Sequence, residues 1–171
     1  KYAGTYNATD SCWYTINLAD NRKIQLTTPQ TFPAWDEDND VPNYPSPHGM
    51  AGWAKGDAAL LIYDRYDIWS FDPEGKKAPV RLTKNGRENK VTYRRIVLDR
   101  EQMDIDLKEP MLMTGFNEVD KSTAVYRARF IAPATPTLLA GGNFNYDNVM
   151  KAKNADKYIY SKENFEVYPD V

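Results

Sequence analysis

The sequence predicts an all-β fold, and three observations lead to that prediction. Apolar and polar residues alternate with a period of two along much of the chain, whereas the i, i+3, i+4 pattern of amphipathic helices is nearly absent. The 171 residues include twelve tyrosines and four tryptophans, which suit the half-buried surface of a sheet. Gly, Pro, Asn and Asp separate the apolar runs, as expected for the turns of antiparallel hairpins.

The alternation also predicts where the individual elements lie. One short helix is expected near the C-terminal end, over residues 146–153. Strands of ordinary length are expected over residues 12–18, 23–27, 59–64, 67–72, 79–82, 91–98, 110–116, 123–130 and 157–160.

An internal repeat refines the fold class. Residues 52–83 are interpreted as one blade of a β-propeller, and residues 13–27 as a partial copy of it. Trp13 precedes Thr27 by the same interval as Trp69 precedes Thr83, with an apolar run and a polar turn in between. A repeat of strands and turns at roughly fifty residues is typical of propeller blades.

The length of the chain then predicts an incomplete β-propeller. A propeller has four to eight blades of roughly 40 to 50 residues, so 171 residues hold about three. Blade edges left unpaired in this way are expected to pair with another chain, for example in a homo-oligomer. The predicted order is a partial blade (1–28), a Pro- and Asp-rich excursion (29–50), two blades (51–84 and 85–131) and a second partial blade (132–171).

Composition and charge exclude several function classes. The net charge is -2 and charges of both signs are interleaved, so nucleic acid is not an expected partner. No apolar run reaches the roughly 18 residues of a membrane span, and no secretory signal segment opens the sequence. The single cysteine excludes an internal disulfide and a cysteine-based metal cluster. Since the sequence begins at Lys1 in the middle of a pattern, we interpret it as part of a longer protein.

No catalytic machinery is expected in this chain. The G-x-S-x-G nucleophile elbow of α/β-hydrolases does not occur, and His48 is the only histidine. The sequence therefore predicts no catalytic residue, no resident metal and no cofactor.

The excursion before the second blade is the predicted contact site for a substrate or partner. It contains five prolines and a cluster of carboxylates, and long loops on rigid scaffolds often carry function. An inter-blade cover without function is the alternative. The candidate residues are Trp35, Asp36, Glu37, Asp38, Asp40 and His48.

Asp36, Asp38 and Asp40 have the D-x-D-x-D spacing of a calcium-binding loop, but the rest of that motif is absent. Val41 stands where the turn needs Gly, and Pro47 where a bidentate Glu belongs. A cation bound in another geometry, Asx-turns in a solvated tip, and an acidic lining for a basic ligand terminus all stay open.

Two segments of the chain resemble a known family. They are PAWDEDNDVPNYPSPHGMAGWAKGDAALLIYDRYDIWSFDPEGKKAPVRLT and KAKNADKYIYSKENFEVYPDV. Both are similar to the N-terminal β-propeller of prolyl oligopeptidase (S9) family serine peptidases, in particular a group common in Bacteroidetes. The most specific part is the run from Trp53 to Trp69, and the last twenty residues agree more loosely.

The resemblance implies a non-catalytic domain of a periplasmic or secreted peptidase, related to the N-terminal domain of dipeptidyl peptidase IV-like enzymes. Such a propeller gates and orients peptide substrates for a C-terminal α/β-hydrolase domain. The catalytic residues of the family lie in that hydrolase domain, so none is carried over to this chain. A stand-alone protein-binding propeller and a carbohydrate-binding β-sandwich are the alternatives.

Overall fold

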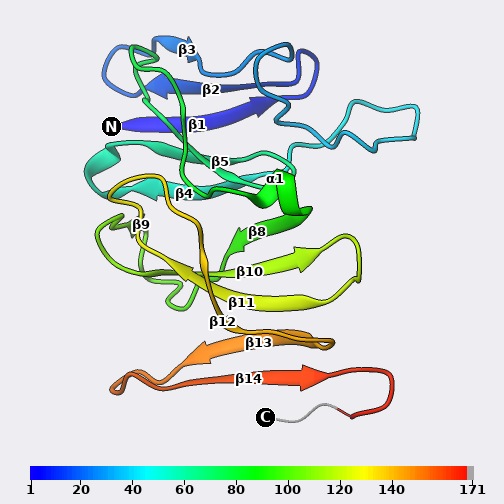
Figure 1. Ribbon diagram of the computed structural model, residues 1–171. Helices are drawn as coiled ribbons and strands as arrows, with labels where there is room; N and C mark the ends of the chain where they lie inside the picture. Colours follow the sequence, from blue (N-terminus) through cyan, green and yellow to red (C-terminus); the bar gives the residue numbers. More distant parts are fainter. Residues whose placement is uncertain (169–171) are drawn as a thin grey trace.

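The computed structural model describes residues 1–168, which form four mainly antiparallel β-sheets in chain order (Figure 1). Within each sheet, strands that follow one another in the chain pair with each other. One strand is the exception, because it lies between two strands of the third sheet in the sequence but pairs with the second sheet. The first sheet contains β1 (Tyr2–Asn7), β2 (Cys12–Asn17) and β3 (Lys23–Gln25). The second contains β4 (Met50–Ala54), β5 (Leu60–Tyr63), β6 (Ile68–Phe71) and β7 (Val80–Arg81), with β9 (Asp104–Ile105) parallel to β4.

The other two sheets follow along the chain. The third contains β8 (Val91–Arg95), β10 (Met111–Asn117), β11 (Thr123–Ala128) and β12 (Thr137–Ala140), and the fourth contains β13 (Asn145–Lys151) and β14 (Tyr158–Glu163). A 3₁₀ turn covers Lys55–Asp57, and the helix α1 covers Gly86–Asn89. Because β12 pairs with β11, the third sheet extends past residue 131, where its blade was expected to end.

The second sheet is buried on both faces, and this gives the molecule two cores. All four residues of β5 are buried. Leu60 and Ile62 point to a core shared with Trp13 of the first sheet, whereas Leu61 and Tyr63 point to a core shared with the third sheet. The period of two along a strand therefore distributes one apolar run between two cores.

The prediction of a mainly β fold is confirmed, and each expected strand overlaps an observed one. The alternation missed β1, β4, β9, β12 and β13. In β1, Gly4 occupies a position that would otherwise carry an apolar side chain. A Cβ atom at this position would lie 3.0 Å from Leu60 Cδ2, so close packing against the second sheet favours glycine and hides the alternation.

The helix expected over residues 146–153 is wrong, because this segment is strand β13. The pairing of β13 with β14 shifts register between Asp147 and Met150, and Asn148 has a φ of 52°. Such a bulge interrupts the period of two, so that the sequence pattern no longer identifies a strand. The only α-helix within residues 1–168 is α1.

The internal repeat is present in the hydrogen bonds, but the alignment of the two tryptophans is wrong by one residue. Thr27 Oγ1 accepts the N–H of Trp13 at 2.8 Å, and Thr83 Oγ1 accepts the N–H of Ile68 at 2.9 Å. Ile68, and not Trp69, therefore occupies the position of Trp13. The shift reverses the face: Ile68 points toward the third sheet, whereas Trp69 points back toward the first.

One six-residue hairpin turn occurs three times, over residues 7–12, 17–22 and 117–122. Its pattern is Asn-x-x-Asp followed by two residues. In each copy the Asn and Asp side chains accept main-chain N–H groups two residues ahead. The fifth residue has a positive φ, namely 54° at Ser11, 58° at Asn21 and 63° at Lys121. These Asx-type contacts replace ladder hydrogen bonds at the hairpin tips.

Candidate functional site

The excursion between β3 and β4 is a loop with a closed base and a projecting acidic tip (Figure 1). Trp35 and Pro47 form an isolated antiparallel bridge. Next to it, Asp36 N donates to Ser46 O at 2.8 Å and His48 N donates to Ala34 O at 3.1 Å. Since Ala34 is fully buried in the first core, the base of the loop is fixed to the sheets.

The acidic tip reaches the turn between β5 and β6 of the second sheet. Arg65 of this turn forms an ion pair with Asp38, with Nη2 2.8 Å from Oδ2. On its other side, Arg65 Nε donates to Glu118 Oε1 at 2.9 Å, and Tyr66 Oη donates to Glu118 Oε2 at 2.8 Å. One arginine therefore connects the excursion, the second sheet and the β10–β11 turn of the third sheet.

The same contacts determine the charge of Glu118. Burial favours the neutral acid, but the hydrogen bonds from Tyr66 and Arg65 outweigh burial, so that the pKa of Glu118 lies below its ordinary value. Glu118 is therefore a carboxylate at neutral pH, and its interaction with Arg65 is a charge-assisted hydrogen bond.

Two more arginines complete this group. Arg87 is 43% exposed, and its Nη2 lies 3.5 Å from Asp64 Oδ2 and 3.6 Å from Glu37 Oε2. Arg94 donates to the main-chain oxygens of Tyr93, Asp64 and Arg65, and its guanidinium lies over the ring of Tyr63. We name this group the turn-end cluster; it consists of Glu37, Asp38, His48, Asp64, Arg65, Arg87, Arg94 and Glu118.

His48 is the neutral member of the turn-end cluster. Its Nε2 atom is buried and has no hydrogen-bond partner among residues 1–168. Burial and the positive charge of Arg94 lower the pKa of His48, against the opposing effect of Glu37, Asp36 and Asp64. The imidazole is therefore uncharged at neutral pH.

Asp67 lies behind the cluster and is fully buried and fully hydrogen-bonded. It accepts from Thr83 Oγ1, from the main-chain N–H groups of Gly86 and Arg87, and from Arg81. Asp64 is similarly bonded to the N–H groups of its own turn. Both carboxylates therefore satisfy buried donors of the surrounding turns, which is a structural role.

The structure places the predicted contact residues in different environments. Glu37, Asp38 and His48 join the turn-end cluster. Asp36 lies near His48 and accepts the N–H of Asp38 at 3.1 Å. Trp35 is half-buried at the base of the loop, and Asp40 is exposed, without a hydrogen bond or ion pair in the described part of the chain.

Sequence reasoning did not find the partners of these residues. Arg87 of α1, Arg94 of β8 and Glu118 of the β10–β11 turn lie far from the excursion in the sequence, and they join it, directly or through Arg65, only in the folded chain. Across residues 1–168, no group of three His, Cys, Asp or Glu side chains is arranged to hold a metal ion. What the cluster offers is a half-exposed arginine and an acidic tip, which together can contact charged groups of a ligand.

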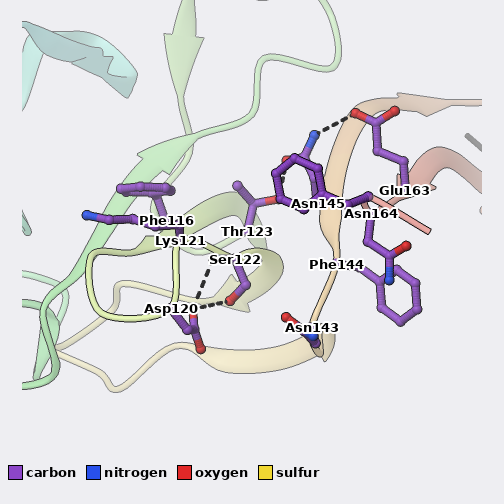
Figure 2. Close-up of a pocket in the computed structure, with 11 residues that line it drawn as sticks. Phe116, Asp120, Lys121, Ser122, Thr123, Asn143, Phe144, Asn145, Glu163 and Asn164 are labelled. Atoms are coloured by element: carbon purple, nitrogen blue, oxygen red, sulfur yellow. Dashed lines mark hydrogen bonds between the residues drawn. The ribbon is translucent and has the colours of Figure 1, made fainter. Parts of the chain in front are cut away.

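A cleft of about 480 Å³ lies beside the cluster, between the β10–β11 turn and the fourth sheet (Figure 2). Three phenylalanines, Phe116, Phe144 and Phe165, give it an apolar lining. Polar side chains, mostly amides and carboxyls, surround them. Since Glu118 belongs to the cluster while Asp120 and Lys121 line the cleft, a single turn borders both features.

Hydrogen bonds hold the polar side of this cleft in place. Thr123 Oγ1 accepts the N–H of Tyr146 and donates to Asn145 Oδ1 at 2.9 Å. Asn145 Nδ2 in turn donates to Glu163 Oε1 at 3.1 Å (Figure 2). Through this chain of contacts, β11 positions the carboxylate of Glu163 at the edge of the cleft.

Within residues 1–168, no helix has the length and apolar character needed to cross a membrane. Comparisons of the chain with protein-family models, with curated proteins and with solved structures gave no match.

Proposed function

We propose that the four sheets are successive blades of a β-propeller, and that this propeller is a non-catalytic domain of a serine peptidase. In this role the chain gates and orients peptide substrates for an α/β-hydrolase domain of the same protein. The proposal places the protein in the periplasm or outside the cell, as in the family that the sequence resembles.

The burial of the second sheet on both faces is the observation that carries the proposal. Blades of a propeller are antiparallel sheets of consecutive strands, and each blade packs face to face against the blades before and after it. Here the second sheet packs on the first through one core and on the third through another. A two-sheet sandwich would bury only one face of each sheet, so the carbohydrate-binding sandwich is less consistent with this arrangement.

The repeated contact of Thr27 and Thr83 supports the same proposal. Thr27 follows β3 and accepts the N–H of Trp13, the second residue of β2. Thr83 follows β7 and accepts the N–H of Ile68, the first residue of β6. Equivalent side chains then point to equivalent cores, as in a chain of repeated units.

The turn-end cluster is the proposed contact surface for substrates. Turns from the second and third sheets meet the excursion there, and loops on a rigid scaffold are the usual site of recognition. Arg65 forms an ion pair with Asp38 in the acidic tip of the excursion, and in this proposal the pair limits how far the loop moves. We therefore assign Arg65 a positioning role in gating.

An assay of the full-length protein tests this proposal. It should hydrolyse proline-containing peptide amides and react with active-serine probes. In addition, Arg65→Ala should change the ratio of kcat/KM between long and short peptides at least threefold, while the value for the shortest substrate stays unchanged. Arg100→Ala, which replaces an exposed arginine far along the chain from these contacts, is the matched control.

Two results would overturn the proposal: a full-length protein without a hydrolase domain, or one that is inert to active-serine probes. Either result would favour the second candidate, a protein-binding propeller that acts alone. The specific observation in favour of that candidate is the set of exposed apolar side chains on β14, which includes Tyr158 and Ile159.

A further inference from the structure

The cleft beside the β10–β11 turn combines an apolar floor with free amide groups. Phe144 is half-buried, Phe116 is 38% exposed, and Phe165 is fully exposed. The volume of about 480 Å³ lies within the range of roughly 300 to 1,000 Å³ that is usual for ligand pockets. The cleft is therefore large enough to enclose an apolar side chain together with its neighbouring main chain.

The polar groups at its rim retain hydrogen-bonding capacity. The amide of Asn143 has no hydrogen bond among residues 1–168, and Asn164 uses only Oδ1, which accepts the N–H groups of Glu166 and Val167. Within the same described residues, Glu163 uses only Oε1, for the contact with Asn145. A side-chain amide can donate to and accept from one peptide group at the same time, so these groups match the N–H and C=O of an extended main chain.

From this arrangement we propose that the cleft binds an extended peptide segment, with an apolar side chain of the peptide between Phe116 and Phe144 and the peptide main chain against Asn143 and Asn164. This inference deepens the proposed function and rests on it for the identity of the partner, since it makes the cleft a contact for the peptide substrate. The binding event itself does not require hydrolysis.

The ring environment favours a peptide over a carbohydrate. Sugars stack on flat aromatic faces, which must be open. Here the amine of Lys162 lies 3.9 Å from the centroid of the Phe144 ring, and that of Lys121 lies 5.8 Å from the centroid of the Phe116 ring. Each of these cation–π contacts occupies one face of its ring, which reduces the aromatic surface available to a sugar. The space between the rings suits a compact apolar side chain.

Calorimetry on the full-length protein tests the proposal with defined probes. The probes are acetylated and amidated pentapeptides without proline, of sequence Gly-Ser-X-Ser-Gly with X as Phe, Leu or Ser. We expect binding of the Phe and Leu peptides and at least tenfold weaker binding of the Ser peptide. Phe144→Ser should weaken binding of the Phe peptide at least tenfold, and Asn143→Ala at least threefold.

Controls separate binding from folding and from catalysis. Met103→Ser replaces an apolar side chain that is 87% exposed outside the cleft, and it should leave the affinity unchanged. If Phe144→Ser fails to fold, as judged by circular dichroism, Phe116→Ser and the exposed Asn143→Ala still decide the question. If the protein binds the peptides but hydrolyses no substrate, the proposed function is refuted, whereas the assignment of the cleft to peptide binding remains.

Three results would overturn the inference. One is the absence of peptide binding at millimolar concentration. Another is equal affinity for the Phe and Ser peptides. The third is binding of a linear pentasaccharide that is lost in Phe144→Ser, because it would assign the cleft to glycans.

Discussion

Thr83 Oγ1 donates its hydrogen to Asp67 Oδ1 at 2.7 Å, and Thr83 Oγ1 also accepts the N–H of Ile68 at 2.9 Å. All three groups are buried. Thr27 makes the corresponding main-chain contact to Trp13 in the first sheet, but Cys12 stands there at the position of Asp67. The two threonines are therefore matched in geometry and differ in the number of buried partners.

Replacement of these threonines should show that difference. Thr83→Val leaves the buried N–H group of Ile68 without a partner and removes one of the donors to the buried carboxylate of Asp67, and we expect a loss of about 3 kcal/mol in the free energy of unfolding. Thr27→Val leaves only an N–H group, and we expect a loss of about 1 to 2 kcal/mol. Urea unfolding of both variants measures the two losses, and equal losses would show that the hydrogen bond from Thr83 to Asp67 adds nothing to stability.

The two acidic partners of Arg65 should differ in the same kind of experiment. Glu118 contacts both Arg65 and Tyr66, and its side chain is 21% exposed. Its replacement by Ala should cost about 1 to 2 kcal/mol. The side chain of Asp38 is 70% exposed, and Asp38→Ala should cost less than about 0.5 kcal/mol, since exposed ion pairs contribute little.

Salt provides a second measurement of the Arg65 pairs. The small contribution of Asp38 should disappear at 1 M salt, where screening acts over about 3 Å. A large loss on Asp38→Ala, or one that salt does not reduce, would show that the tip of the excursion is held more tightly than its exposure implies.

His48 allows a direct measurement of the electrostatics in the turn-end cluster. It is the only histidine in the sequence, so its imidazole signals in a proton NMR titration need no assignment. Burial and Arg94 lower its pKa in the folded protein, and we expect a midpoint below the ordinary value of about 6.5. A midpoint above 6.5 would show that Glu37, Asp36 and Asp64 dominate instead.

The lowered pKa of His48 also predicts how stability depends on pH. The unfolded chain takes up a proton at a higher pH than the folded chain does. The contribution of neutral His48 is therefore complete above about pH 6.5, and it decreases as the pH falls toward the folded pKa. Relative to His48→Gln, the wild type should lose stability between pH 7 and pH 5, as measured by denaturant unfolding at each pH.

The repeated hairpin turn predicts opposite effects of two substitutions at Asn21. This residue has a φ of 58°, a conformation that glycine adopts freely and β-branched residues strongly disfavour. Asn21→Gly should change the free energy of unfolding by less than about 0.5 kcal/mol. Asn21→Val should cost about 1 to 2 kcal/mol.

A neighbouring position of the same turn serves as the control. Ala19 is exposed and has no positive φ, so Ala19→Val should be nearly neutral. If Ala19→Val and Asn21→Val had the same cost, the effect would come from the added side chain and not from the left-handed backbone.

Local patterns accounted for much of the fold. The apolar run from Leu60 to Tyr63 and the Asp-rich turn after it identify a strand and a hairpin, because side-chain alternation and turn chemistry depend only on neighbouring residues. The same approach failed for β13, where a bulge interrupts the alternation, and for Trp69, where a shift of one residue exchanges the two faces of a strand.

The sequence by itself determined the β class, most of the strands and the acidic loop that carries Glu37, Asp38 and His48. Only the tertiary structure decided what those residues touch. Arg65 meets Asp38 across 27 positions of the chain and Glu118 across 53, and the cleft between Phe116 and Phe144 exists only because the third and fourth sheets lie side by side. Contacts of this length depend on register and sheet packing, which no local pattern encodes.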